Sequence, residues 1–183
     1  MINDIFEGII AIILLILSIL FPSEAYNREA FGGWRDFDGD CQNQRQELLI
    51  KESTVPVKFK DNKRCTVLEG RWVSPYTGEI IHSANQIDID HVLPIAVSWE
   101  YGSKYWSRAK RVKFYNDPIN ILPVEKSLNR KKGSKDITEW LPPLNKCDYI
   151  NRFITVLEAY ELNPPPHKMA QFQDMLKDCN QNI

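Results

Sequence analysis

The clearest alternation of hydrophobic and polar residues lies in the segment 87–91, which reads Ile-Asp-Ile-Asp-His. Its two-residue period is typical of a β-strand with one buried face. Pro94 has no backbone N–H and would interrupt a ladder of strand hydrogen bonds, so we expect the strand to end before it. The pattern therefore predicts a strand that carries His91 near its end.

Weaker patterns along the rest of the chain predict short strands and amphipathic helices. Strands are expected over 54–60, 65–73, 79–82 and 119–123, and helices over 42–53, 96–101, 105–115, 124–133, 136–140, 151–160 and 169–176. The segment 151–160 has the best helical pattern, because its apolar residues recur on one face. These elements predict one domain of the α+β class, with short antiparallel strands and added helices.

The first 25 residues differ in composition from the rest of the chain. An apolar run of 13 residues over 9–21 is followed by Pro-Ser-Glu-Ala at 22–25, with small residues at the two positions that a signal peptidase reads. A helix needs about 20 residues to cross a bilayer. The residues before the run include two acids and lack the usual positive charge. We expect residues 1–25 to be a cleaved secretory signal rather than an uncleaved anchor, and 26–183 to be a single mature domain.

Net charge says little about partners, but the distribution of charge says more. The 183-residue chain has 23 basic and 24 acidic side chains. Three of the acids and none of the bases precede residue 26, so the formal charge of the mature chain rises from −1 to +2. Basic residues gather in two stretches, 104–113 and 126–135. Stretches of this kind are expected where a protein contacts phosphate groups.

The four cysteines are widely spaced, and none of them forms a Cys-x-x-Cys pair of the kind that binds zinc. In an exported protein they predict two disulfides, whereas a cytosolic protein would keep four buried thiols. Three pairings are possible, and each bridge would contribute on the order of 3 kcal/mol by restricting the unfolded chain. The sequential pairing joins Cys41 to Cys65 and Cys147 to Cys179.

Candidate catalytic residues lie in three segments. The pair Asp90-His91 sets an oxygen ligand for a hard cation beside a base whose ordinary pKa is near neutrality. An Ile-Asn-Ile-Leu-Pro sequence follows at 119–123, and Asn129 then precedes a run of three cations at 130–132. An amide can supply a second oxygen ligand, and the cations can bind phosphate. The combination indicates metal-dependent hydrolysis of a phosphodiester bond.

Six ordered motifs extend this pattern over most of the chain, from about residue 34 to 179. They are Asp40-Cys41 with Arg45 and Glu47, Gly70 with Pro75-Tyr76-Thr77-Gly78, Asp88-x-Asp90-His91-Val92-x-Pro94, Phe114-x-Asn116-Asp117-Pro118-x-Asn120-Ile121-Leu122, Asn129-x-x-Lys132-Gly133, and Glu139-Trp140-Leu141-Pro142-Pro143. Together they resemble the ββα-metal, or HNH, nucleases in their His-Asn-Asn form. The resemblance is closest to the C-terminal domain of GmrSD-type restriction enzymes and to small secreted bacterial proteins that share it.

The resemblance implies a ββα-metal core and a role for each matched residue. His91 corresponds to the general base that activates water, and Asn120 to the residue that braces the loop bearing it. Asp90 and Asn129 correspond to the two protein ligands of one divalent cation. Mg²⁺ fits best, with Mn²⁺ or Ca²⁺ as alternatives, because it takes oxygen ligands and can stabilise the leaving 3′ oxygen. Cleavage would then leave a 5′ phosphate and a 3′ hydroxyl.

Several polar neighbours have two interpretations. Asp88 shares a strand face with Asp90, so it either supports the metal or faces solvent. Arg45 is a further supporting residue of the site, although an internal ion pair with Glu47 is the favoured interpretation. A basic cluster is often only a solvated face, but its position directly after Asn129 favours phosphate binding. The nucleic-acid-binding residues are expected to be Lys126, Arg130, Lys131 and Lys132.

Two other classes of function remain open. A zinc hydrolase would use His82, His91 and one of the neighbouring aspartates, but the chain has no compact pair of histidines. Tightly held zinc without nuclease activity would favour that class. A catalytically silent secreted binding module would keep the fold alone, and the complete set of Asp90, His91 and Asn129 argues against it.

The sequence therefore predicts a secreted or periplasmic bacterial endonuclease, monomeric and free of the membrane once its signal is removed. DNA is the expected substrate, and RNA is a second one. The chain has no recognisable helix-turn-helix or zinc finger. Contacts with the nucleic-acid backbone should therefore dominate, with little sequence preference and a steep dependence on salt.

Overall fold

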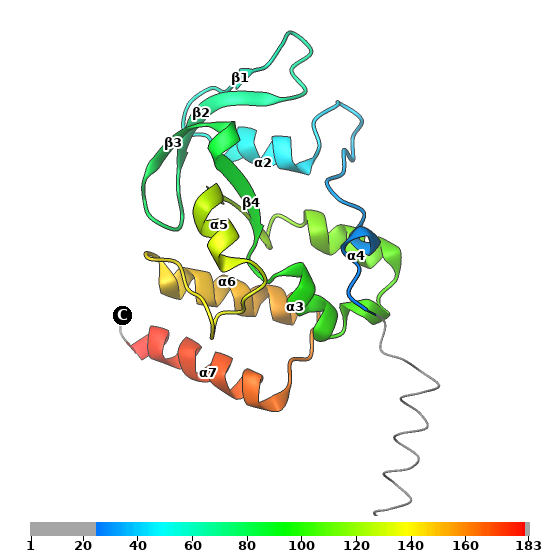
Figure 1. Cartoon of the computed structure of the whole chain (residues 1–183), viewed down its shortest axis with the longest axis vertical. Coiled ribbons are helices and arrows are strands. Elements are labelled where there is room, and N and C mark those ends of the chain that lie inside the picture. The colour runs from blue at the N-terminus through cyan, green and yellow to red at the C-terminus, as the bar shows by residue number, and fades with distance from the viewer. Residues whose placement is uncertain (1–24, 182–183) are drawn as a thin grey trace, which may run out of the picture.

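The computed structural model of the chain describes residues 25–181 (Figure 1). Almost all of the expected signal segment therefore lies outside the described residues. Within the described range, no helix is both long and apolar enough to cross a membrane. The helices are α2 (Gln44–Glu52), α3 (Ile95–Glu100), α4 (Arg108–Asn116), α5 (Lys126–Lys132), α6 (Lys146–Ala159) and α7 (Pro166–Gln181), with the short 3-10 helices η1 (Arg28–Phe31), η2 (Ala84–Gln86) and η3 (Ser103–Tyr105).

The strands form two small antiparallel sheets. One sheet has the order β1-β2-β3, and the other pairs β4 with β5. In the second sheet Asp90 lies opposite Leu122 and His91 opposite Ile121. The helix α5 follows β5 directly and packs on both β4 and β5. The strands are β1 (Lys58–Phe59), β2 (Val67–Val73), β3 (Ile80–Ser83), β4 (Ile87–His91) and β5 (Ile121–Glu125).

The elements agree with the α+β prediction, and the differences have physical reasons. The strand β4 has the bounds 87–91 that its alternation predicts. The strand β5 continues to Glu125, two residues beyond Pro123, where we expected it to end. Because its sheet has only two strands, the outer edge of β5 needs no partner, and a residue without an N–H is tolerated there. The helices α6 and α7 begin at Lys146 and Pro166, before the starts at 151 and 169 that their apolar patterns predict.

Two hydrophobic cores meet along β4. Leu49, Trp72 and the isoleucines of β4 pack between α2 and the three-stranded sheet. The larger core surrounds α6 and includes Val92 and Phe153, with contributions from α3, α4 and α7. Figure 1 shows β4 running from the sheet and α2 at one end of the molecule toward α6 and α7 at the other. The end of β4, where His91 lies, is therefore the junction of the two cores.

Both predicted disulfides are present, with the sequential pairing. Cys41 pairs with Cys65, which joins the chain before α2 to the start of β2. Cys147 pairs with Cys179, which joins the first turn of α6 to the last turn of α7. No free cysteine is found in the described part of the chain. The second bridge therefore lies at the larger core, whereas the first lies near the surface.

Candidate active site

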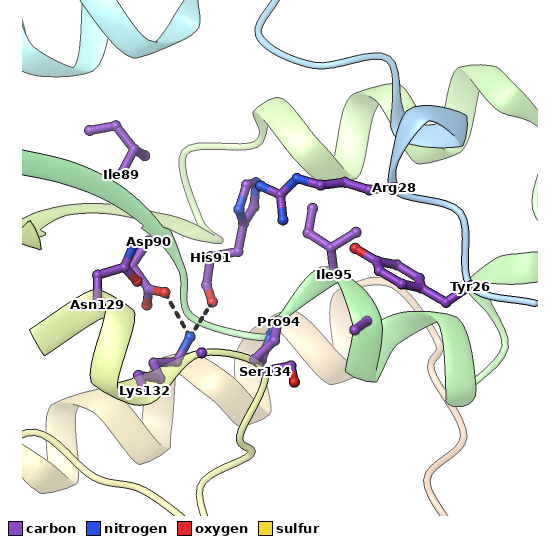
Figure 2. Close-up of a pocket in the computed structure, with 12 residues that line it drawn as sticks. Tyr26, Arg28, Ile89, Asp90, His91, Pro94, Ile95, Asn129, Lys132 and Ser134 are labelled. Atoms are coloured by element: carbon purple, nitrogen blue, oxygen red, sulfur yellow. Dashed lines mark hydrogen bonds and ion pairs between the residues drawn. The ribbon is translucent and has the colours of Figure 1, made fainter.

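A pocket of about 410 Å³ opens beside the end of β4 (Figure 2). Asp90 and His91 enter it from β4, and Asn129 and Lys132 enter it from α5. The opposite wall includes Arg28, from the segment that precedes α2. The pairing of β4 with β5, followed at once by α5, brings these residues together although they are distant in sequence.

The His91 side chain is held in one orientation. Its Nε2 lies 2.8 Å from the backbone carbonyl oxygen of Tyr115. A carbonyl can only accept a hydrogen bond, so Nε2 carries the proton in the neutral ring and Nδ1 carries the lone pair. The indole of Trp34 stacks on the imidazole with ring centroids 5.4 Å apart and planes within 8°. These two contacts fix the orientation of the imidazole ring and therefore the position of its unprotonated Nδ1.

Burial decides the protonation state of this histidine. His91 is only 6% exposed. Burial lowers its pKa to about 4, against the opposing effects of the Tyr115 hydrogen bond and the Asp90 charge. The nearby charges of Arg28 and Lys132 lower the pKa further. His91 is consequently neutral at pH 7, and its Nδ1 keeps a lone pair that can accept a proton.

Asp90 is buried and held on both carboxylate oxygens. Its Oδ1 accepts a hydrogen bond from Lys132 Nζ at 2.7 Å. Its Oδ2 accepts from the hydroxyl of Tyr76 at 2.6 Å and from that of Tyr149 at 3.4 Å. Burial and the negative charge of Asp90 raise the pKa values of both tyrosines well above the usual range, so their hydroxyls stay protonated and remain donors.

The turn before β3 places Tyr76 against Asp90. Glu125, the last residue of β5, accepts hydrogen bonds from the hydroxyls of Ser74 and Thr77 on either side of that tyrosine. The Tyr76 carbonyl in turn accepts from the backbone N–H of Leu144. The loop 74–77 is thereby attached to β5 through Glu125 and to β4 through Asp90.

Asn129 and Asp90 are suitable ligands for a hard cation. Asn129 Nδ2 donates to Asp88 Oδ2 at 3.4 Å. Among the described residues, none donates a hydrogen bond to Asn129 Oδ1. A carboxylate has about four acceptor positions, and the protein fills three of them on Asp90, which leaves one on Oδ1. One carboxylate oxygen and one amide oxygen of the same pocket thus fit a divalent cation that prefers oxygen.

Lys132 was expected to bind nucleic acid as part of an exposed basic cluster, but its side chain is buried. Its side chain is 1% exposed, and its ammonium donates to Asp90 Oδ1 and, at 2.8 Å, to the carbonyl oxygen of His91. Arg130 and Lys131 are exposed on the same helix, and Lys126 reaches the carbonyl oxygen of Asn85. The surface cations of α5 are therefore Lys126, Arg130 and Lys131, and Lys132 points inward.

Asn120 fixes the backbone that follows His91. It is fully buried, and its Oδ1 accepts from Leu93 N at 2.8 Å while its Nδ2 donates to Leu93 O. Its own carbonyl oxygen accepts from the N–H of Val92. The turn between β4 and α3 is thereby attached to the start of β5.

The expected ion pair between Arg45 and Glu47 is absent from the described residues. The Arg45 guanidinium donates instead to the carbonyl oxygens of Ala84 and Ile87, at 3.3 and 3.0 Å. Glu47 accepts from the side chain of Gln44. Arg45 therefore anchors the chain that leads into β4, because backbone carbonyls are closer to it than the carboxylate.

The structure does not assemble the zinc ligands of the alternative function. His82 is exposed on β3, where its Nδ1 lies 3.3 Å from the carbonyl oxygen of Gly70. Between residues 25 and 181, one group of three or more acidic, histidine or cysteine side chains comes within metal-ligand distance, namely Asp36, Asp38 and Asp40. His82 and His91 thus do not share a site.

Sequence reasoning missed four residues that shape the pocket. Tyr149 precedes the expected helix 151–160, and Arg28 belongs to no motif. Trp34 is held in place by Asn116, which accepts from Arg35 N and donates to Gly33 O. Asn116 and Tyr76 both belong to the motifs of the family resemblance, and that membership could have identified them as site residues. The missed residues are Arg28, Trp34, Tyr76 and Tyr149.

Two comparisons with known proteins give a match. The family described as "GmrSD restriction endonucleases, C-terminal domain" matches residues 40–163. A protein of Arthroderma benhamiae, described as "Uncharacterized secreted protein", is 31% identical over 162 residues, which cover 86% of this chain and 78% of that protein. No solved structure matches the chain. The range matched by the family contains β4 and α5, which bear Asp90, His91, Asn129 and Lys132 of the pocket.

Proposed function

Because the chain belongs to the family of GmrSD restriction endonuclease C-terminal domains, we propose that it is a metal-dependent endonuclease of the HNH type. Membership points to a nuclease and so to a nucleic acid as substrate. The observation that carries the finer proposal is the orientation of His91. Its Nε2 is bound to a carbonyl, so Nδ1 is the base, and it shares a pocket with two oxygen ligands. The order β4, β5, α5, with β4 and β5 antiparallel, supports the proposal of a ββα-metal core.

The proposed reaction assigns a role to Asp90, Asn129 and His91 of the pocket. Asp90 and Asn129 would hold one divalent cation, for which Mg²⁺ is the best candidate, and the bound cation would supply positive charge for the leaving oxygen. His91 Nδ1 takes the proton of the attacking water. The Tyr115 carbonyl keeps the required tautomer, and together with the Asp90 charge it stabilises the imidazolium that forms.

Substrate binding is assigned to Arg28 of the pocket wall and to three cations of α5. Arg28 lies on the wall opposite α5, with its Nη2 3.3 Å from the Tyr115 hydroxyl (Figure 2). A guanidinium there can bind a phosphate on one side of the scissile bond, and Lys126, Arg130 and Lys131 can bind phosphates on the other side. These contacts do not read bases, so we expect DNA and RNA cleavage with little sequence preference.

The proposed setting is outside the cell. The relative from Arthroderma benhamiae is described as secreted, and disulfides persist in oxidising compartments. We propose that residues 1–25 are removed as a signal and that the mature chain acts as a monomer. A bacterial origin stays a prediction.

The test is cleavage of supercoiled DNA, single-stranded DNA and RNA by the purified protein with Mg²⁺, Mn²⁺, Ca²⁺, Zn²⁺ or EDTA. His91→Ala should lower the rate by about 10²- to 10⁴-fold, since proton transfer by a placed base contributes that much. The matched control is His82→Ala, an exposed histidine outside the pocket, which should cleave at the wild-type rate. An unimpaired His91→Ala enzyme would overturn the mechanism. DNA binding without cleavage under every metal would favour a binding module.

A further inference from the structure

Lys132 is a cation of the pocket to which the proposed reaction assigns no role. It cannot reach a phosphate at the surface, because its side chain is 1% exposed. Its ammonium lies between two acceptors, at 2.7 Å from Asp90 Oδ1 and 2.8 Å from the His91 carbonyl oxygen (Figure 2). Asn129 lies one helical turn earlier on the same face of α5. The lysine therefore contacts the proposed metal ligand and the backbone of the proposed base at once.

We infer that Lys132 is a positioning residue that fixes the cation-binding carboxylate relative to the base. This inference rests on the proposed function. Neighbouring side chains of a strand point to opposite faces, so the separation between Asp90 and His91 Nδ1 depends on the backbone between them. Lys132 joins the backbone of His91, through its carbonyl oxygen, to the Asp90 carboxylate itself. One ammonium thus links the two groups whose spacing the reaction requires.

The partners on the other side of Asp90 make this link rigid. The hydroxyls of Tyr76 and Tyr149 occupy Oδ2, so the carboxylate cannot rotate while Lys132 holds Oδ1. One acceptor position on Oδ1 then remains for a cation, on a carboxylate that is held in one orientation. The positive charge of Lys132 also repels that cation, so the arrangement provides a placed ligand at the cost of affinity.

This double effect gives Lys132→Met a signature that a purely structural residue would not have. Mn²⁺ binding, measured by electron paramagnetic resonance without nucleic acid, should become roughly tenfold tighter or more, because a repelling charge is gone. The kcat for plasmid cleavage should fall by about 10- to 100-fold with little change in KM, as is typical when the partner of a metal ligand is removed. Tighter metal binding with slower turnover is the expected result.

The matched control is Lys168→Met, which removes a lysine from a second buried aspartate, Asp136, outside the pocket around His91. It should leave kcat and Mn²⁺ affinity unchanged. If Lys132→Met does not fold, Lys132→Gln removes the charge but keeps hydrogen-bond donors, so Mn²⁺ binding should tighten as in Lys132→Met while kcat falls less. A folded Lys132 variant with wild-type kcat and Mn²⁺ affinity, on an enzyme that still needs His91, overturns this inference alone. If the wild-type protein cleaves nothing, the proposed function fails instead.

Discussion

Two buried aspartates of this chain each bind a lysine, and they differ in what else surrounds them. Lys132 lies 2.7 Å from Asp90, and Lys168 lies 2.7 Å from Asp136. Both carboxylates are 4% exposed, whereas Lys132 is 1% exposed and Lys168 is 24% exposed. An ion pair with this geometry says nothing by itself about function, since buried carboxylates generally need such a partner.

The hydrogen bonds to each carboxylate distinguish the two pairs. Asp136 accepts four, namely two from Thr138 on Oδ1 and one each from Lys168 and Tyr101 on Oδ2. These bonds fill the acceptor positions of a carboxylate, and Asp136 closes the turn 136–140. Asp90 accepts three, and it lines the same pocket as the proposed base His91 and as Asn129. The comparison indicates that a carboxylate left one bond short in a pocket is the one available to a cation.

The most direct way to break this comparison is to remove each charge in turn. Asp90→Asn and Asp136→Asn each leave a lysine without its partner, and the free energy of unfolding should fall by about 3–5 kcal/mol for the more buried Asp90 pair. The fall should be smaller for Asp136, because Lys168 is partly exposed and can reach water. Urea denaturation measures both effects.

Activity should separate the same two variants completely. Asp90→Asn should lose cleavage together with its dependence on Mg²⁺, while Asp136→Asn should cleave plasmid DNA at the wild-type rate per folded molecule. A Mg²⁺ titration against rate tests this. Equal loss of activity in both variants would mean that Asp90 acts through stability alone.

The tyrosines provide a smaller and sharper test. Tyr76 donates to Asp90 at 2.6 Å, and Tyr101 donates to Asp136 at 3.3 Å. Tyr76→Phe removes the shorter of the two hydrogen bonds to Oδ2 of the proposed metal ligand and leaves the 3.4 Å bond from Tyr149, and kcat should fall by about tenfold. Tyr101→Phe should change only stability, by about 1 kcal/mol. Steady-state kinetics and thermal unfolding of both variants distinguish the outcomes, and an unchanged kcat for Tyr76→Phe would contradict the role of a fixed Asp90.

The smallest expected effect is a change in acid stability. Burial alone would raise the pKa of Asp136, but hydrogen bonds from Lys168 and Thr138 outweigh it, and the net pKa is lowered below 3.8. A lowered carboxyl pKa stabilises the folded state above its unfolded value, and that contribution is lost as pH falls through the folded pKa. Asp136→Asn should therefore lose stability at pH 7 but show a flatter decline below pH 4. A parallel decline of wild type and variant would contradict this account.

Much of the site could be predicted from local sequence. The alternation at 87–91 gave the bounds of β4, and the spaced motifs led to the family that the match over 40–163 confirms. Asp90, His91 and Asn129 do line one pocket. The cysteine count predicted the disulfides, although it left their pairing open.

Other features depended on contacts that no local pattern encodes. In the run Arg130-Lys131-Lys132 the three cations look equivalent, and only the packing of α5 on β4 turns the last of them inward. Arg45 was expected to pair with Glu47, two residues away, but residues two apart on a helix do not face each other. Arg28 and Tyr149 reach the site from opposite ends of the chain without any motif.

The sequence by itself determined the candidate chemistry, namely an acid, a histidine and an amide carried on a strand and a helix. It could do so because strand alternation and motif spacing are local properties of the chain. Only the tertiary structure decided which nitrogen of His91 is free, which lysine is buried and which aspartate keeps an acceptor position. Those properties depend on hydrogen bonds between segments that lie far apart in sequence and meet where the two cores join.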